Sequence, residues 1–167
     1  VIVNVKTLPL VSAGSDQSAC AGSLTTLSGS GGTSYNWSTG EVTADILVNP
    51  LTTTTYTVTA TLDGCTDSDE VIVSVTALPV ANAGADQIIC LGESANLTGS
   101  GGASYEWSTT EVTAIIIVNP TVTSTYTLTV TENSCTAQDE VVVNVTSVSV
   151  LANAGDDIAI CIGDNVN

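Results

Sequence analysis

Cysteines and carboxylates are the side chains of this sequence that could do chemistry. The cysteines are Cys20, Cys65, Cys90, Cys135 and Cys161. Thiolates can bind zinc or act as nucleophiles, but the spacing contains no CxxC pair and the chain has no histidine to complete such a site. The favoured interpretation is therefore structural disulfides, which persist in an oxidising, extracellular compartment.

Carboxylates crowd one predicted hairpin, and some of them recur 70 residues later. The calcium-ligand candidates are Asp63, Asp67, Asp69, Glu70, Asp139 and Glu140. Calcium prefers oxygen ligands, and an ion between modules can stiffen an array. However, no EF-hand or nonapeptide calcium motif is present, so a solvated acidic surface is the favoured interpretation and Ca²⁺ the alternative. No other cofactor is implied, and a glycosidase pair of carboxylates is disfavoured because these acids lie on a turn without an evident cleft.

The charge balance excludes several functional classes. The 167 residues include 17 acidic side chains and one basic one, Lys6, which gives a net charge of −16. Binding to nucleic acid needs clusters of Lys and Arg, so no nucleic-acid partner is expected. Without histidine the usual general base is missing, and we expect no enzyme. No apolar run approaches the roughly 20 residues of a membrane helix, so no transmembrane segment is predicted.

The chain consists of a repeat that positions these residues. Residues 11–80 and 81–150 align with 39 identities, and such a fixed period indicates tandem modules. Residues 1–9 match 71–79, and residues 152–161 match 81–90 after a one-residue insertion. The predicted domains are the last strand of a preceding repeat at 1–9, a module at 10–80, a second module at 81–150 and the start of a following repeat at 151–167. We expect a longer array, or end strands that complete modules in neighbouring chains.

Alternating apolar and polar residues predict an all-β module. The expected strands of the first module are 9–13, 23–29, 33–38, 44–49, 54–61 and 71–76, separated by turn residues. Within 54–61, Tyr56, Val58 and Ala60 share one face, and the threonines share the other. Short strands with turns about every ten residues predict small antiparallel sandwiches of about 70 residues each.

Four aromatic residues are predicted to fill the cores of these modules. They are Trp37, Trp107, Tyr56 and Tyr126. The alternative for the tryptophans is a platform on which sugars stack, as in carbohydrate-binding modules. Core filling is favoured because each Trp shares its inward face with a Tyr two residues earlier.

The pattern of residues resembles known modules. A Trp on the third strand, a Thr-Tyr-x-Val-x-x-Thr strand and a valine-rich last strand resemble the immunoglobulin-like plan. The segments AGSDQ-x-x-C-x-G and AGADQ-x-x-C-x-G resemble the polycystic-kidney-disease (PKD) type of this sandwich. The whole repeat, with SGG-x-SY-x-WST, VNP, TYT and CT-x-x-DEV, is similar to modules of very long surface proteins of gliding bacteria that are exported by the type IX route. This resemblance implies an extracellular, cell-surface location and a structural role.

Two cysteine pairings are open. Each repeat carries its own pair, which favours disulfides within modules. If a short fifth strand follows Trp37, as the immunoglobulin plan implies, Cys20 and Cys65 lie at opposite ends of their sandwich. Cys20 then lies nearer Cys135, and the bond joins neighbouring modules. Closing loops of this size stabilises a fold by roughly 3–5 kcal/mol.

Isoleucines distinguish the second module from the first. Ser18-Ala19 becomes Ile88-Ile89, Asp45 becomes Ile115, and Leu47 becomes Ile117. Ile115 and Ile117 have the outward parity of their strand, because Ile116 and Val118 match the inward Ile46 and Val48. Exposed apolar groups often mark contact sites. The sequence therefore predicts an assembly contact at Ile88, Ile89, Ile115 and Ile117, with neutral drift as the alternative.

Together these features predict a structural segment of an extracellular bacterial repeat protein, such as a surface fibre, filament or adhesin stalk, with no catalytic activity. The expected partners are neighbouring repeats of the same chain and identical chains in a filament. The alternatives are a module that binds carbohydrate or another surface ligand, and a spacer within a large secreted enzyme.

Overall fold

The computed structural model describes residues 1–3 and 5–147, and this part of the chain is all β with twelve strands and no helix. The first module comprises β1 (Gln17–Cys20), β2 (Thr25–Ser28), β3 (Ser34–Trp37), β4 (Asp45–Val48), β5 (Thr54–Leu62) and β6 (Cys65–Thr76). The second module comprises β7 (Gln87–Cys90), β8 (Ala95–Thr98), β9 (Ser104–Trp107), β10 (Ile115–Val118), β11 (Ser124–Glu132) and β12 (Cys135–Thr146). The expected following repeat at 151–167 lies outside the described residues.

Both modules have the same strand order. In the first, a four-stranded sheet β1-β6-β5-β3 faces a two-stranded sheet β2-β4, and in the second β7-β12-β11-β9 faces β10-β8. All pairs are antiparallel except β1 with β6 and β7 with β12, which are parallel. This arrangement is a tandem of immunoglobulin-like sandwiches, because β2 and β4 take the places of strands B and E, and β3, β5 and β6 those of C, F and G.

The alternation in the sequence corresponds to the two faces of each sheet. Tyr56, Val58 and Ala60 are buried, and Val71 and Val73 of β6 lie fully in the same core. β-Branched valines suit such a pleated, buried face. The threonines of β5 point away from this core, and Thr59 shares a hydrogen bond of 2.9 Å with Ser68 on β6. The long hairpin of β5 and β6 therefore supplies much of the core on one face and hydrogen-bonded polar side chains on the other.

The start of each module differs from the sequence prediction. Residues 9–13 form no strand, and only an isolated bridge joins Ser12 to Ser30 near the end of β2. The chain then crosses to the other sheet, where β1 pairs in parallel with the last residues of β6. The first segment of the module thus touches both sheets and brings Cys20 to the end from which the chain leaves.

Gly101 brings the connecting segment close to the second module. Its φ is 108°, and a Cβ atom at this position would collide with the backbone carbonyl of Val80. Gly31 holds the same place in the first module, with a φ of 94°. Next to Gly101, Asn82 and Ser100 exchange backbone hydrogen bonds of 3.0 and 2.8 Å. Only glycine combines this backbone conformation with such a close approach, so the repeated glycine fixes how the chain enters each sandwich.

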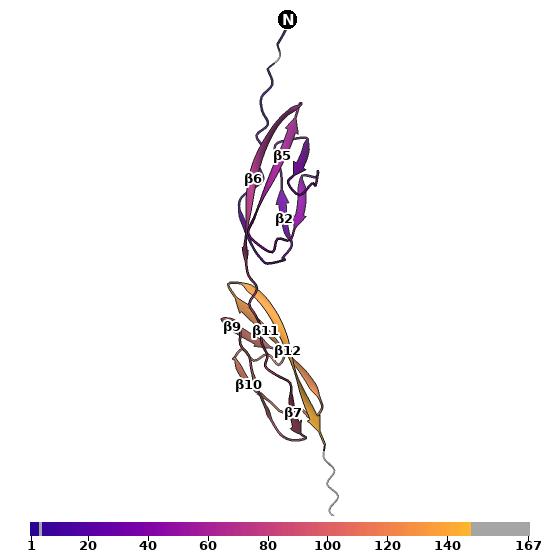
Figure 1. The fold of residues 1–167 in the computed structure, drawn as a ribbon, viewed down its shortest axis with the longest axis vertical. Coiled ribbons are helices and arrows are strands. Elements are labelled where there is room, and N and C mark those ends of the chain that lie inside the picture. The colour runs from indigo at the N-terminus through magenta and orange to yellow at the C-terminus, as the bar shows by residue number, and fades with distance from the viewer. Residues whose placement is uncertain (4, 148–167) are drawn as a thin grey trace, which may run out of the picture.

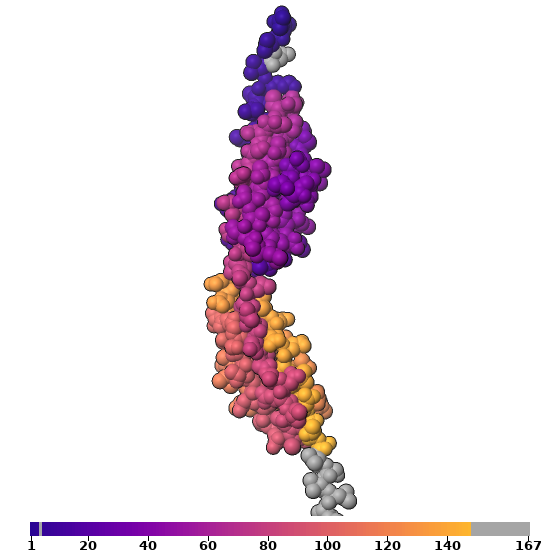
Figure 2. Space-filling view, in the orientation of Figure 1, coloured from indigo at the N-terminus to yellow at the C-terminus, as the bar shows by residue number. Residues whose placement is uncertain are grey.

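The modules follow each other end to end. Figure 1 shows β6 running the length of the first module towards the waist between the modules. Figure 2 shows two lobes joined by a narrow waist, with the hairpin between β11 and β12, coloured orange, next to the first module. Within residues 1–3 and 5–147 no helix is long and apolar enough to cross a membrane.

Candidate functional site at the module junction

Cys20 lies at the exit end of the first module. It is the last residue of β1, and its register partner is Thr76, the last residue of β6. The backbone N–H of Ala21 extends this pairing by donating to the Thr76 carbonyl at 2.9 Å. The cysteine is therefore held next to the point where the chain passes into the second module.

Cys135 lies at the entry end of the second module. It begins β12, directly after the tight turn of the β11–β12 hairpin, and pairs with Glu132. The two turn residues, Asn133 and Ser134, have φ values of 48° and 66°. Positive φ at both central residues is typical of a type I′ hairpin, which matches the twist of the flanking strands. The turn thus projects Cys135 towards the first module on a short, rigid support.

A disulfide between Cys20 and Cys135 joins the two modules. Their Cα atoms are 5.6 Å apart, within the usual range for a disulfide, and their sequence separation is 115 residues. The Cys135 side chain is 2% exposed. The disulfide of the structure thus links two modules. The sequence favoured disulfides within each module, and for Cys20 and Cys135 this prediction is wrong.

The length of β6 explains this correction. Cys65 is the first residue of β6, whereas Cys20 lies opposite its last residue. At about 3.3 Å per residue, a strand of this length separates the two cysteines by about 36 Å. A disulfide requires Cα atoms within about 7 Å. Cys65 and Cys90 have free thiols, and Cys161 lies outside the described residues.

The acidic residues near the hairpins do not form a calcium cluster. Asp69 and Glu70 are consecutive in β6 and therefore lie on opposite faces of the sheet. Asp69 accepts a hydrogen bond of 2.9 Å from the backbone N–H of Ala13, whereas Glu70 accepts one of 3.4 Å from Thr57 on the outer face. Across residues 1–3 and 5–147 no group of three or more His, Cys, Asp or Glu side chains is placed to hold a metal.

The same division between the two faces of the sheet holds for Asp139 and Glu140 of the second module. Asp139 accepts from the Ala83 N–H at 2.8 Å, and Glu140 faces Thr127 on the outer side. The Asp67 carboxylate accepts from the N–H of Ser68 at 2.9 Å. The carboxylates at these positions are therefore used separately, as acceptors for nearby donors.

Asp69 has a structural role that the sequence did not reveal. The N–H groups of Ala13 and Glu70 donate to its carboxylate and hold its pKa below the ordinary value, although partial burial acts in the opposite direction. Because Ala13 lies in the first segment and Asp69 in β6, the hydrogen bond fixes the start of the module to its last strand.

Asp16 and Gln17 are two further structural residues that sequence reasoning missed. Asp16 accepts from the Ile72 N–H at 2.9 Å, and Gln17 donates to the Thr26 carbonyl on the other sheet at 3.1 Å. Asp86 and Gln87 make the same bonds in the second module. The repeated Asp-Gln pair before each first-strand cysteine was the available signal. Its role is to position β1 and β7, and with them Cys20 and Cys90.

The tryptophans are not exposed for sugar stacking. Trp37 and Trp107 are each 2% exposed, and each indole N–H donates at 3.0 Å to a backbone carbonyl, that of Thr43 or Thr113. Tyr56 is buried in the first core, and Tyr126 packs at the edge of the second. A carbohydrate platform needs an exposed indole face, and neither tryptophan provides one.

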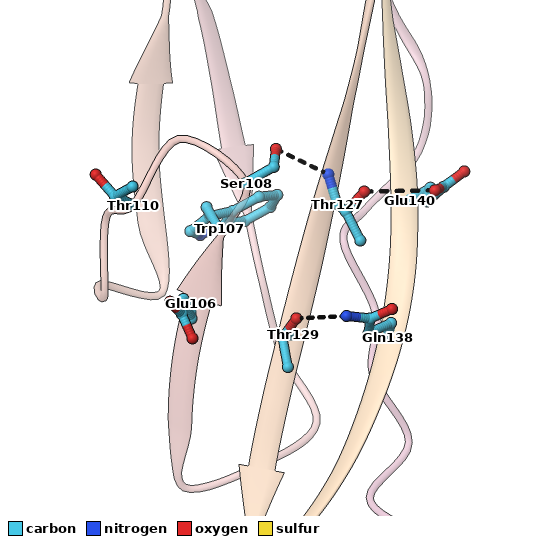
Figure 3. Close-up of a pocket in the computed structure, with 8 residues that line it drawn as sticks. All are labelled: Glu106, Trp107, Ser108, Thr110, Thr127, Thr129, Gln138 and Glu140. Atoms are coloured by element: carbon cyan, nitrogen blue, oxygen red, sulfur yellow. Dashed lines mark hydrogen bonds between the residues drawn. The ribbon is translucent and has the colours of Figure 1, made fainter.

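A shallow hollow of about 510 Å³ lies on the outer face of β9, β11 and β12, next to Trp107. Figure 3 shows that its polar side chains are bonded to one another: Gln138 donates to Thr129 at 2.9 Å, and Thr127 donates to Glu140. With Trp107 covered, the hollow offers an acidic, hydroxyl-rich surface and no stacking plane.

The predicted assembly isoleucines do not form one patch. Ile115 and Ile117 are 61% and 69% exposed on the outer face of β10, in accordance with their parity. Ile88 is exposed on β7, which belongs to the other sheet. Ile89 is 8% exposed and lies in the core, so its inclusion in an exposed contact is corrected.

The strand order and the crosslinked junction define a tandem of immunoglobulin-like sandwiches. No protein-family model matches the chain, and no curated protein matches it. Among solved structures it is similar to the insect immune protein hemolin, with 14% identity over 83% of this chain and 46% of that chain, at a TM-score of 0.43. It is also similar to an I-band fragment of titin, with 14% identity over 86% of this chain and 67% of that chain, at a TM-score of 0.40. The chain thus spans about half of hemolin, and the fold assignment rests on its own strand order.

Proposed function

We propose that this chain is a structural segment, without catalytic activity, of an extracellular repeat protein that forms a surface fibre, filament or adhesin stalk. The observation that carries the proposal is the Cys20–Cys135 disulfide. Pairing within one module would stabilise that module alone. A bond between modules also fixes how they sit relative to each other, which is useful when the modules transmit position or force along an array.

The distribution of charge supports this role. Among the described residues no charged side chain is buried in a core, so the acidic side chains lie on the flanks of the two sandwiches. With 17 acidic residues against one basic residue, neighbouring arrays repel each other. High net charge of one sign keeps proteins soluble and opposes nonspecific association. Such flanks suit a hydrated fibre.

The finer assignment rests on sequence motifs. The repeated AGxDQ-x-x-C-x-G and SGG-x-SY-x-WST segments resemble PKD-like modules of long surface proteins that gliding bacteria export by the type IX route. We assign the chain to this kind of cell-surface protein. Its disulfide supports an oxidising location, because the cytosol keeps most thiols reduced. A spacer inside a secreted enzyme would use the same modules and differs only by a catalytic domain elsewhere in that protein.

Protease treatment of intact source cells tests this location and the crosslink together. Released peptides are analysed by mass spectrometry without reduction, with a cytosolic protein as the control for lysis. We expect a released peptide pair that joins the segments around Cys20 and Cys135. If the chain is cleaved only after lysis and both cysteines carry free thiols, the extracellular assignment is wrong.

A further inference from the structure

The two free cysteines of the described chain are the unmatched halves of the junction. Cys65 occupies the place in the first module that Cys135 occupies in the second, and Cys90 occupies the place that Cys20 occupies in the first. Cys65 is half-buried and Cys90 is exposed. The first module therefore has a hairpin cysteine at the end where the chain enters it, and the second has a first-strand cysteine at the end where the chain leaves it.

Cys65 is presented in the same way as Cys135. It follows a two-residue turn, Asp63-Gly64, whose φ values are 51° and 82°, so both turns have left-handed backbone at both positions. Leu62 pairs with Cys65 just as Glu132 pairs with Cys135. The two-residue turn that carries the hairpin cysteine is therefore the same at the entry end of the first module.

The segment that enters the first module runs past this hairpin. The Lys6 side chain donates a hydrogen bond to the backbone carbonyl of Asp63. By the repeat, Lys6 aligns with Thr76, the residue that lies opposite Cys20 at the described junction. Cys65 thus lies beside the position at which a preceding copy of the module would hold its first-strand cysteine.

The exit end of the second module has, around Cys90, the same local arrangement as the first module has around Cys20. Cys90 lies opposite Thr146 at the ends of β7 and β12, and the Leu91 N–H donates to the Thr146 carbonyl at 3.0 Å. A hollow of about 340 Å³ opens there, lined by Cys90, Leu91, Thr146 and Ser147. The corresponding hollow of the first module, about 350 Å³, has the hairpin residues 133–135 in its wall beside Cys20. The described part of the second module therefore presents, around Cys90, a hollow of the same kind as the one in which Cys20 meets its hairpin partner.

We infer that Cys65 and Cys90 are crosslinking sites for further copies of this module, Cys65 for the first-strand cysteine of a preceding copy and Cys90 for the hairpin cysteine of a following one. This inference deepens the proposed structural function and rests on it. A head-to-tail contact of this kind can be repeated from each module to the next along an array.

The bond forms by thiol–disulfide exchange with a small disulfide oxidant such as glutathione disulfide. The Cys90 thiolate attacks one sulfur of the oxidant and releases one thiolate. The hairpin cysteine of the following copy then attacks the Cys90 sulfur of this mixed disulfide and releases the second thiolate. Two protein thiols are oxidised, their two protons pass to solvent or to the released thiolates, and the oxidant is reduced to two thiols.

Such bonds would overlap along the array and limit how far it can stretch. From a hairpin cysteine to the first-strand cysteine of the next module is about 25 residues, which spans about 90 Å when fully extended. This segment runs from the entry end of one module to the exit end of the next, where a disulfide would connect it to the following module. The shortest covalent path along the crosslinked array therefore uses one such segment and one disulfide for every two modules. Two folded modules extend about 72 Å, if the length of about 36 Å for β6 represents one module. A fully crosslinked array would therefore lengthen by only about a quarter even if its modules unfolded.

The test uses the full chain with residues 11–150 present twice in succession, so that four modules follow each other with the natural register. Cys161 is replaced by Ser because it lies outside the described residues. The protein is oxidised in a glutathione buffer, its free thiols are alkylated and counted by mass, and its disulfides are mapped. We expect Cys90 of the first copy to be bonded to Cys65 of the second copy, which leaves two free thiols.

Every other result overturns the inference. Four free thiols with both Cys20–Cys135 bonds intact would show that the modules fold and that the additional junction is not crosslinked. If the Cys20–Cys135 bonds are also absent, the crosslinked junction itself is wrong. A matched variant, Cys90→Ser in the first copy only, should raise the count from two free thiols to three. An extended array on intact cells without the Cys90–Cys65 bond would leave the proposed function standing and remove only this inference.

Discussion

Cys20 and Cys65 lie at opposite ends of the first module, because Cys65 begins β6 and Cys20 pairs with the residue that ends it. The two cysteines of a repeat therefore serve two different junctions. Cys20 bonds to the hairpin of the second module, whereas Cys65 follows the hairpin turn that Lys6 of the preceding segment contacts at the Asp63 carbonyl. A disulfide therefore joins the first-strand cysteine of one repeat to the hairpin cysteine of the next repeat, and not the two cysteines of one repeat.

Removing the junction disulfide should destabilise both modules. The bond closes a loop whose ends are 115 residues apart, and in the chain-entropy description such a loop contributes about 4–5 kcal/mol. We expect Cys20→Ser and Cys135→Ser to lower the urea midpoint by the same amount, and the double variant to add nothing, since all three remove one bond. Cys65→Ser is the control and should leave the midpoint unchanged. A further loss in the double variant would mean that the cysteines act separately.

The sequence predicted the sandwiches well because their signals are local. Alternation along β5 and β6 and the 70-residue repeat identified the faces and the number of modules. The strand β1 was missed, because a four-residue edge strand that pairs in parallel with a distant strand leaves little alternation to detect. Cys20 lies on that strand, so its partner was undecided by the sequence. The partner of Cys20 depends on which end of β6 lies next to β1, and that is decided by the topology of the sheet.

The pKa of Asp69 predicts that the first module loses stability in acid. Its folded pKa lies below the ordinary value of 3.8, so the unfolded chain binds more protons in the interval between the two values. Stability from this group is present above the unfolded pKa and is lost as the pH falls through the folded one. We expect Asp69→Asn to flatten this part of the dependence of the melting temperature on pH between about 2 and 5.

Asp45→Asn is the matched control for that measurement, because Asp45 lies exposed on β4 of the same module. It should leave the acid-dependent loss intact. If wild type and Asp69→Asn lose melting temperature in parallel across this range, the Ala13–Asp69 hydrogen bond does not control the acid sensitivity.

Gly101→Ala should disturb the entry of the chain into the second module. The new methyl group would have to displace the Val80 backbone and adopt an unfavourable left-handed conformation, which together cost about 2–4 kcal/mol. Gly92→Ala has a similar φ of 95° but meets no neighbouring atom within 4 Å, so it should cost only about 1 kcal/mol. Denaturant unfolding of both variants separates collision from strain, and equal losses would contradict the close approach.

The junction disulfide should also shield the residues between Cys20 and Cys135 from tension. When the chain is pulled from its ends, force passes from Cys20 through the disulfide to Cys135, and the residues between them form a closed loop outside the force path. Reduction would release about 400 Å of additional chain, from 115 residues at about 3.5 Å each. Single-molecule stretching in oxidising and reducing buffer measures this difference. The Cys20→Ser variant should give the longer extension in both buffers, and an oxidised wild-type chain that also reaches the longer extension would show that the modules are not joined by this bond.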